Sequence, residues 1–313
     1  MITQRVRKAF TMIELLFVIV ILGIVGGFAL EAVRQYYEGI FRTQEYTKRV
    51  AEADQILEQL SKYFENAISS SIVNLDINPG TVACYGPPTT SASDFTVAFV
   101  GVDVDSMRGI SGNRPGWSEE VQLVAGSNDI NGSDANYTMA NNIISLLGTS
   151  TLRGSALYDS ESIDSNACVR FNFAGEGKVG FHKLDGVNPN PMANGLLRLN
   201  NDNNATHGHR KYLLRTGYAF RVDDNGSFWM YSNFRPWADE HFSASGKINL
   251  LGQNVAHFYA DYNATDFMNN PSVSDRGLVW RLKVCMRGLD TNLSTSDTES
   301  QGICRERRVH VRY

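Results

Sequence analysis

Residues 10–30 read FTMIELLFVIVILGIVGGFAL, an apolar run with one carboxylate, Glu14, close to its start. At about 1.5 Å per residue, a helix of this length spans roughly 30 Å, which is the thickness of the hydrocarbon core of a bilayer. The stretch therefore predicts one membrane-spanning helix. Arg5, Arg7 and Lys8 precede it, and the positive-inside rule places that end in the cytoplasm and the rest of the chain on the other side.

Glu14 is a charged side chain inside the predicted membrane segment, where a lone charge costs about 3 kcal/mol. The segment offers no partner, because no Lys, Arg or His lies between Phe10 and Val33. The carboxylate must therefore reach the lipid headgroups or pair with a cation of another molecule.

Residues 8–16, KAFTMIELL, resemble the cleavage and methylation signature of type IV prepilins and type II secretion pseudopilins. In that family a dedicated peptidase cuts before the Phe and methylates the new amine, and the Glu pairs with the terminal ammonium of a neighbouring subunit. The resemblance implies leader cleavage between Ala9 and Phe10, N-methylation of Phe10 and subunit pairing in the membrane through Glu14. The family usually has Gly where this chain has Ala9.

The same resemblance implies three kinds of partner: other pilins or pseudopilins in a filament, the prepilin peptidase and an inner-membrane assembly platform. An ordinary signal anchor is the alternative interpretation of the segment. The order of basic flank, Phe-Thr-x-x-Glu and apolar run favours the prepilin signature.

The composition bounds the class of protein. The chain has 313 residues, of which 42% are hydrophobic, enough for one sizeable globular domain outside the membrane or two small ones. Its net charge is −4, and loss of residues 1–9 removes three cations and leaves −7, which argues against a broad nucleic-acid surface. No Gly-x-Ser-x-Gly, His-Glu-x-x-His or phosphate-binding glycine loop is present. We therefore expect neither an enzyme nor a cofactor.

All four cysteines follow the membrane segment, in what should be an oxidising compartment: Cys84, Cys168, Cys285 and Cys304. An even number there predicts two disulfides, for which three connectivities exist. We favour Cys285 with Cys304, which bracket a polar loop, and Cys84 with Cys168. A zinc site is the alternative, but no Cys-x-x-Cys spacing supports it.

A helical apolar period continues beyond the membrane segment to about Ser70 without a proline. We expect one helix from Phe10 to Ser70 whose later part packs on a sheet. A coiled-coil stalk is the alternative, but polar residues interrupt its apolar seam. The expected divisions are a leader peptide at 1–9, a transmembrane helix at 10–30, a periplasmic spine helix at 31–72 and a globular domain at 73–313.

Several strands are predicted in the globular domain. The strongest pattern is a hairpin over residues 218–231 with Asn225-Gly226 in its turn. Further strands are predicted at 95–102, 168–173, 178–181, 248–262 and 277–286. This late order resembles the larger minor subunits of the family, the W-type minor pilin and the J-type pseudopilin. The expected fold class is α+β and pilin-like, with a long N-terminal helix packed on antiparallel β-sheet with long loops.

Two acidic or histidine-containing groups have the spacing of metal ligands. His207 and His209 beside Asp202 could bind a metal from one strand, and Asp103 with Asp105 could contribute to a calcium site. The first group lies in a polar loop and the second lacks further acids. We therefore interpret the first group as a solvated loop and expect no metal at either.

Two other groups of residues, one of cations and one of aromatic side chains, can each be interpreted as a binding surface or as part of the fold. The cation-rich run at 304–313 fits an edge strand protected by charges better than a DNA contact. An aromatic group near the hairpin is interpreted as its core rather than as a ligand face. It consists of Phe228, Trp229, Tyr231, Phe234 and Trp237.

Asn-x-Ser/Thr sequons follow a sharper pattern. Apart from the proline-containing one at Asn270 there are six, at Asn131, Asn136, Asn204, Asn225, Asn263 and Asn292. Each has Asp two residues earlier, at Asp129, Asp134, Asp202, Asp223, Asp261 and Asp290. With 33 acidic residues in 313, six of six by chance is roughly one in a million.

This longer pattern resembles the acceptor required by the periplasmic oligosaccharyltransferases of some Gram-negative bacteria. We hypothesise that several of these asparagines carry glycans, and we expect them to be exposed on loops. The alternative is turn chemistry, because Asp-x-Asn-Gly is good turn material.

The sequence thus predicts a minor pilin or pseudopilin, a structural subunit that primes, caps or joins a type IV pilus or a type II secretion-type filament after leader cleavage. It would cross the inner membrane once, with its N-terminus cytoplasmic and its C-terminal domain periplasmic. The alternative is a single-pass membrane-anchored periplasmic binding protein or adhesin.

Overall fold

The computed structural model describes residues 11–78, 81–84, 95–111, 113–118, 122–123, 129–131, 135–147, 151–159, 171–173, 181–184, 196–198, 211–262, 279–287 and 302–312. The chain divides into two units, residues 1–51 and residues 52–313.

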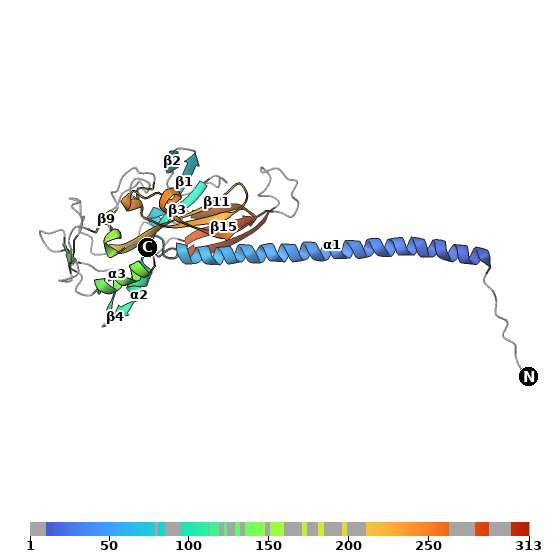
Figure 1. Cartoon of the computed structure of the whole chain (residues 1–313), viewed down its shortest axis with the longest axis horizontal. Coiled ribbons are helices and arrows are strands. Elements are labelled where there is room, and N and C mark those ends of the chain that lie inside the picture. The colour runs from blue at the N-terminus through green and yellow to red at the C-terminus, as the bar shows by residue number, and fades with distance from the viewer. Residues whose placement is uncertain are drawn as a thin grey trace, which may run out of the picture. The chain divides into compact units, whose positions relative to one another are not determined.

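The first helix, α1, runs from Met12 to Phe64 and is drawn as one uninterrupted ribbon in Figure 1. The helix was predicted to end at about Ser70 and the spine segment at residue 72. Both predicted ends were wrong, because the helix ends at Phe64. Residues 66–68 instead hydrogen-bond to β3 (Phe95–Val102) through two backbone bonds of 2.8 and 2.9 Å. The backbone leaves the helix because these pairings to the sheet replace the helical bonds.

The largest sheet among the described residues has the strand order β13-β12-β11-β3-β1-β2, and β8 pairs with both β11 and β9. Neighbouring strands in it are antiparallel. Its strands are β1 (Val73–Asn78), β2 (Thr81–Cys84), β3, β8 (Ala156–Asp159), β9 (Phe181–Lys183), β11 (Lys211–Val222), β12 (Phe228–Phe234) and β13 (Lys247–Gly252).

A second antiparallel sheet has the order β14 (Val255–Tyr262), β15 (Val279–Met286) and β16 (Ile303–His310). Smaller pairings join β4 (Ile110–Ser111) to β5 (Arg114–Pro115), and β7 (Asp129–Asn131) to β6 (Gln122–Leu123) and β10 (Leu196–Arg198). The short helices are α2 (Val104–Arg108), α3 (Tyr137–Leu146), α5 (Phe242–Ser245), η1 (Ser69–Ser71), η2 (Leu152–Gly154) and η3 (Pro236–Ala238). A long N-terminal helix and antiparallel sheets confirm the predicted α+β, pilin-like class.

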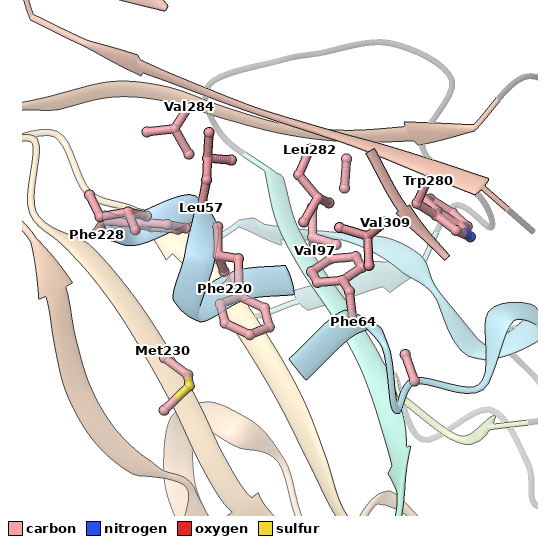
Figure 2. Packing of buried hydrophobic residues seen from close by; sticks show 14 of the residues in the cluster. Leu57, Phe64, Val97, Phe220, Phe228, Met230, Trp280, Leu282, Val284 and Val309 are labelled. Carbon is pink, nitrogen blue, oxygen red and sulfur yellow. The ribbon is translucent and has the colours of Figure 1, made fainter. Parts of the chain in front are cut away.

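The end of α1 is buried between the two larger sheets. Figure 2 shows Leu57 and Phe64 of the helix in one apolar cluster with Phe220 of the first sheet and Leu282 and Val309 of the second. Both helix side chains are at most 2% exposed. Because each sheet covers one side of the same helical turns, the helix end is the centre of this core.

The opposite face of the large sheet carries a second core. It contains Val100 of β3 and Ala219 of β11, with Trp237 and Phe242 packed over them. A third, smaller cluster surrounds α3 and includes Trp117. The domain is thus layered on both faces of its main sheet.

The hairpin and three other predicted strands were confirmed, with revised bounds for most. β3 spans the predicted residues 95–102, and β15 covers most of 277–286. The β11–β12 hairpin turns at Gly226, whose φ of +82° explains the glycine. The predicted strand at 248–262 is two strands, because Asn254 adopts a left-handed φ of 61° between β13 and β14.

The predicted strand at 168–173 was wrong over its described part, residues 171–173. Phe171 is helical and residues 172–173 form a turn, in which Asn172 has a φ of 53° and its Nδ2 donates to Pro236 O over 2.8 Å. An Asn that satisfies its amide in this way tolerates the left-handed conformation. Of the predicted strand at 178–181, Phe181 begins β9, and residues 178–180 lie outside the described residues.

Candidate functional site

The start of α1 is closed by a reciprocal cap between Thr11 and Glu14. Thr11 precedes Met12, the first helical residue, and its backbone N–H and hydroxyl each donate to Glu14 Oε2 over 3.4 Å. Glu14 N donates back to Thr11 O over 3.0 Å. Thr-x-x-Glu is the sequence pattern of a capping box. The carboxylate therefore lies against the backbone of the residue that follows Phe10, while Ala9 and Phe10 themselves lie outside the described residues.

The apolar side chains of α1 from Met12 to Leu30 are exposed. The helix contains an 18-residue window with a mean hydropathy of 2.7, and none of that window is buried. Leu15, Phe17 and Leu22 are 58%, 62% and 64% exposed, although full burial of such a side chain gains about 1.5 to 3 kcal/mol. This surface therefore requires hydrocarbon or other helices around it.

Glycines interrupt this apolar surface at Gly23, Gly26 and Gly27. A Cβ atom added at any of them would meet nothing within 4 Å in the described chain. Packing inside the chain thus does not explain these glycines, and they leave room for another helix to approach the backbone.

The disulfide between Cys285 and Cys304 is present as predicted. The two cysteines are register partners on β15 and β16, with their Cα atoms 4.0 Å apart. The other predicted pair stays a prediction: the backbone of Cys84 lies in β2, whereas its side chain and Cys168 lie outside the described residues.

Asp103 and Asp105, one of the two candidate metal groups, hold an arginine. Arg215 Nη1 lies 3.4 Å from Asp103 Oδ1 and 2.8 Å from Asp105 Oδ2. Asp103 also accepts from the backbone N–H and hydroxyl of Ser106 as the N-cap of α2. Burial raises the pKa of Asp103, and the Ser106 hydrogen bond and the Arg215 charge oppose that rise.

Arg215 thus gives both acids a structural role as partners of one guanidinium. Sequence reasoning missed Arg215, although an arginine directly after the apolar residues 212–214 of β11 was a signal for a buried ion pair. The other candidate metal ligands, Asp202, His207 and His209, lie outside the described residues.

The cation-rich C-terminal run forms β16, which pairs with β15 alone among the described strands. Arg305 Nε binds Asp54 Oδ1 of α1 over 3.0 Å. Further along, Arg307 and Arg312 line a hollow together with Glu58 and other residues of α1. Both signs of charge meet along this edge, which agrees with an edge strand protected by charges.

Three of the five side chains in the aromatic group are buried and two are half-buried. Phe228, Phe234 and Trp237 are buried, as the core interpretation predicts. Trp229 and Tyr231 are half-buried, and the Tyr231 ring packs on Phe242 of the second core, with the ring centroids 5.1 Å apart.

The described sequons occur in three kinds of local structure. Asn225 is exposed in the β11–β12 turn, as expected. Asn136 is half-buried and caps α3, where its Oδ1 accepts from Met139 N over 3.1 Å, so the expectation of an exposed loop was wrong there. The backbone of Asn131 lies in β7, and Asn204, Asn263 and Asn292 lie outside the described residues.

A family model described as the prokaryotic N-terminal methylation motif matches residues 4–30. Comparisons with curated proteins and with solved structures found no match. The matched residues include the Thr11–Glu14 cap and the exposed apolar surface of α1. This motif implies, in general terms, processing by a prepilin peptidase and assembly with other pilins. The chain thus carries a prepilin-type methylation motif on a helix long and apolar enough to anchor it in a membrane.

Proposed function

We propose that the chain is a minor subunit that primes, caps or joins a type IV pilus or a type II secretion-type filament. A prepilin peptidase would remove residues 1–9 and methylate Phe10, and residues 10–30 would anchor the subunit in the inner membrane. The periplasmic part would then comprise the remainder of α1 and the disulfide-containing domain. The observation that carries the proposal is the methylation motif at residues 4–30 on a helix whose apolar side chains are exposed.

Glu14 would select the axial position of a neighbouring subunit. Cleavage leaves a terminal amine at Phe10, and N-methylation keeps it a cation. A lone carboxylate in hydrocarbon costs about 3 kcal/mol, and the two hydrogen bonds from Thr11 are long, at 3.4 Å. A neighbour whose ammonium reaches Glu14 removes the cost of both charges, so only one stagger between helices is favoured.

The size of the domain supports a minor rather than a repeating role. The unit from residue 52 to residue 313 places two sheets around the end of α1, and sequence stretches rich in Gly, Asn and Ser connect its strands. A bulky domain is easier to accommodate at a filament end than along its whole length. Labelling the native filament with an antibody to this domain tests the point: a label along the entire filament contradicts the minor role.

N-terminal peptide mass spectrometry of the protein purified from its own membrane tests the processing. We expect a terminus at Phe10 carrying one methyl group. An intact Met1 terminus in cells with an active prepilin peptidase would overturn the proposal and favour the membrane-anchored binding protein.

Glu14→Ala tests the pairing, with Glu31→Ala as the matched control. Glu31 is a second carboxylate on the same helix, and its Oε1 accepts from Gln35 Nε2 over 3.2 Å. We expect Glu14→Ala to stay in the membrane fraction but to be lost from the sheared filament fraction, whereas Glu31→Ala assembles. Equal assembly of both variants would contradict the role of Glu14.

A further inference from the structure

We propose that the Asp-x-Asn-x-Ser/Thr sites are acceptors of N-linked oligosaccharides and that Asn225 is the site at which the folded domain has room for the glycan. The proposal depends on export of the domain, which is part of the proposed function, but not on filament assembly. Its first support is an internal control in the sequence. The sequon at Asn270 contains Pro271, which blocks N-glycosylation, and it alone has no acid two residues earlier, where Met268 stands.

The structure separates this proposal from turn chemistry. Asp129-x-Asn131 lies in the strand β7, Asn136 of the next site caps the helix α3, and Asp223-x-Asn225 lies in a hairpin turn. Parts of one five-position pattern therefore occur in a strand, at a helix start and in a turn. No single local conformation therefore explains the pattern. An enzyme that recognises the sequence itself would explain it at all of these sites.

At the hairpin, turn chemistry and the acceptor pattern coincide. Asp223 Oδ1 accepts from Ser227 N over 2.7 Å, and Asp223 Oδ2 accepts from Trp229 Nε1 over 3.0 Å. Burial raises the pKa of Asp223, but these hydrogen bonds lower it by more, so its pKa lies below the usual value. The carboxylate is therefore charged and fully engaged in the folded turn.

These hydrogen bonds of Asp223 determine whether glycan transfer precedes or follows folding of the turn. A transferase that binds the Asp223 carboxylate must act before the turn closes, while the exported chain is still folding. Afterwards the exposed Asn225 has room for a glycan, because it lies in a turn whose next residue, Gly226, turns the chain into β12. Asn136 is half-buried in the folded domain, where its amide oxygen accepts from Met139 N, so a glycan has less room there than at Asn225.

The reaction is a glycosyl transfer from a lipid pyrophosphate-linked oligosaccharide. A bond forms between the Asn225 amide nitrogen and the anomeric carbon of the first sugar, and the bond from that carbon to the pyrophosphate oxygen breaks. The lipid pyrophosphate leaves, and the amide proton passes to a base of the transferase. No oxidant or reductant is involved.

Glycopeptide mass spectrometry of the full-length protein from its own cells tests the proposal. We expect a sugar mass on the Asn225 peptide of the wild type. Ser227→Ala removes the sequon and should abolish that mass, whereas Ser227→Thr is the matched control that keeps it. Asp223→Asn retains an oxygen that can accept from Ser227 N but has no charge, and it should lose most of the occupancy.

Three results would overturn the proposal: an unmodified Asn225 peptide in the wild type, equal occupancy in Ser227→Ala and Ser227→Thr, or full occupancy in Asp223→Asn. The oxidised Cys285–Cys304 peptide in the same digest reports whether each variant has folded. The N-terminal peptide reports leader cleavage separately, so failure of the glycan proposal and failure of the pilin proposal give different patterns.

Discussion

Arg215→Met should destabilise the domain by about 3 kcal/mol near neutral pH, because it leaves a buried carboxylate without its cation. The Asp103 side chain has no exposed surface, and Arg215 Nη1 lies 3.4 Å from it. Removing one partner of a buried pair typically costs about 3 to 5 kcal/mol. We take the lower end because this distance is long and Ser106 still donates to Asp103 in the variant.

The loss should shrink in acid. Burial raises the pKa of Asp103 above 3.8, and Ser106 and Arg215 oppose the rise. Because the pKa is higher in the folded state, protonation stabilises the fold below the unfolded pKa, and this contribution is lost as the pH rises through the folded pKa. Without Arg215 the folded pKa rises further, so the stability of the variant falls over a wider pH range than that of the wild type.

Urea unfolding of the full-length protein in detergent, followed by tryptophan fluorescence at about pH 7 and about pH 4, measures both effects. The double variant Arg215→Met/Asp103→Asn removes the charge together with its partner and should recover most of the stability at the higher pH. Equal losses at both pH values, or no recovery in the double variant, would show that Arg215 acts through packing alone and would refute the reasoning.

Three further changes test the core, the disulfide and the edge strand by the same titration. Leu60→Ala, at a fully buried position of α1, should cost about 2 to 5 kcal/mol, and a loss below about 1 kcal/mol would contradict the packing. Reduction of Cys285–Cys304, whose sequence separation is 19, should cost about 3 kcal/mol, and an unchanged urea midpoint in reductant would contradict this. Arg305→Ala should cost less than about 1 kcal/mol, because its ion pair with Asp54 is half-exposed. A larger loss, or one that salt does not diminish, would be inconsistent with a surface pair.

Elements with strong local patterns could be predicted from the sequence. The long helix followed from an apolar period without proline, and the β11–β12 hairpin followed from Asn225-Gly226 between two alternating runs. Glu14 could be selected as a candidate functional residue because a carboxylate in an apolar segment needs a partner. Its capping bond with Thr11 could also have been predicted, since Thr-x-x-Glu precedes the apolar run.

Features that depend on distant segments could not be predicted in this way. The end of α1 is set by backbone pairing between residues 66–68 and β3. The sequence has no glycine or proline near Phe64 from which this end could be predicted. The burial of Arg215 depends on α2, which supplies Asp105 from far away in the sequence. The turn at 172–173 depends on η3, because the Asn172 amide donates to Pro236 O there. In each case the deciding contact is tertiary, and local propensity yields to it.

The apolar side chains at the two ends of α1 are shielded from water in different ways. Variants at the two ends should therefore affect folding and assembly separately. Leu60 and Phe64 are buried by the sheets of their own domain, so that part of the helix can fold without a second subunit. The side chains from Met12 to Leu30 have no such cover within the described chain. A defect at Glu14 should therefore leave domain stability unchanged while it abolishes assembly, whereas a defect at Leu60 should lower domain stability first and reduce assembly only through the amount of folded subunit.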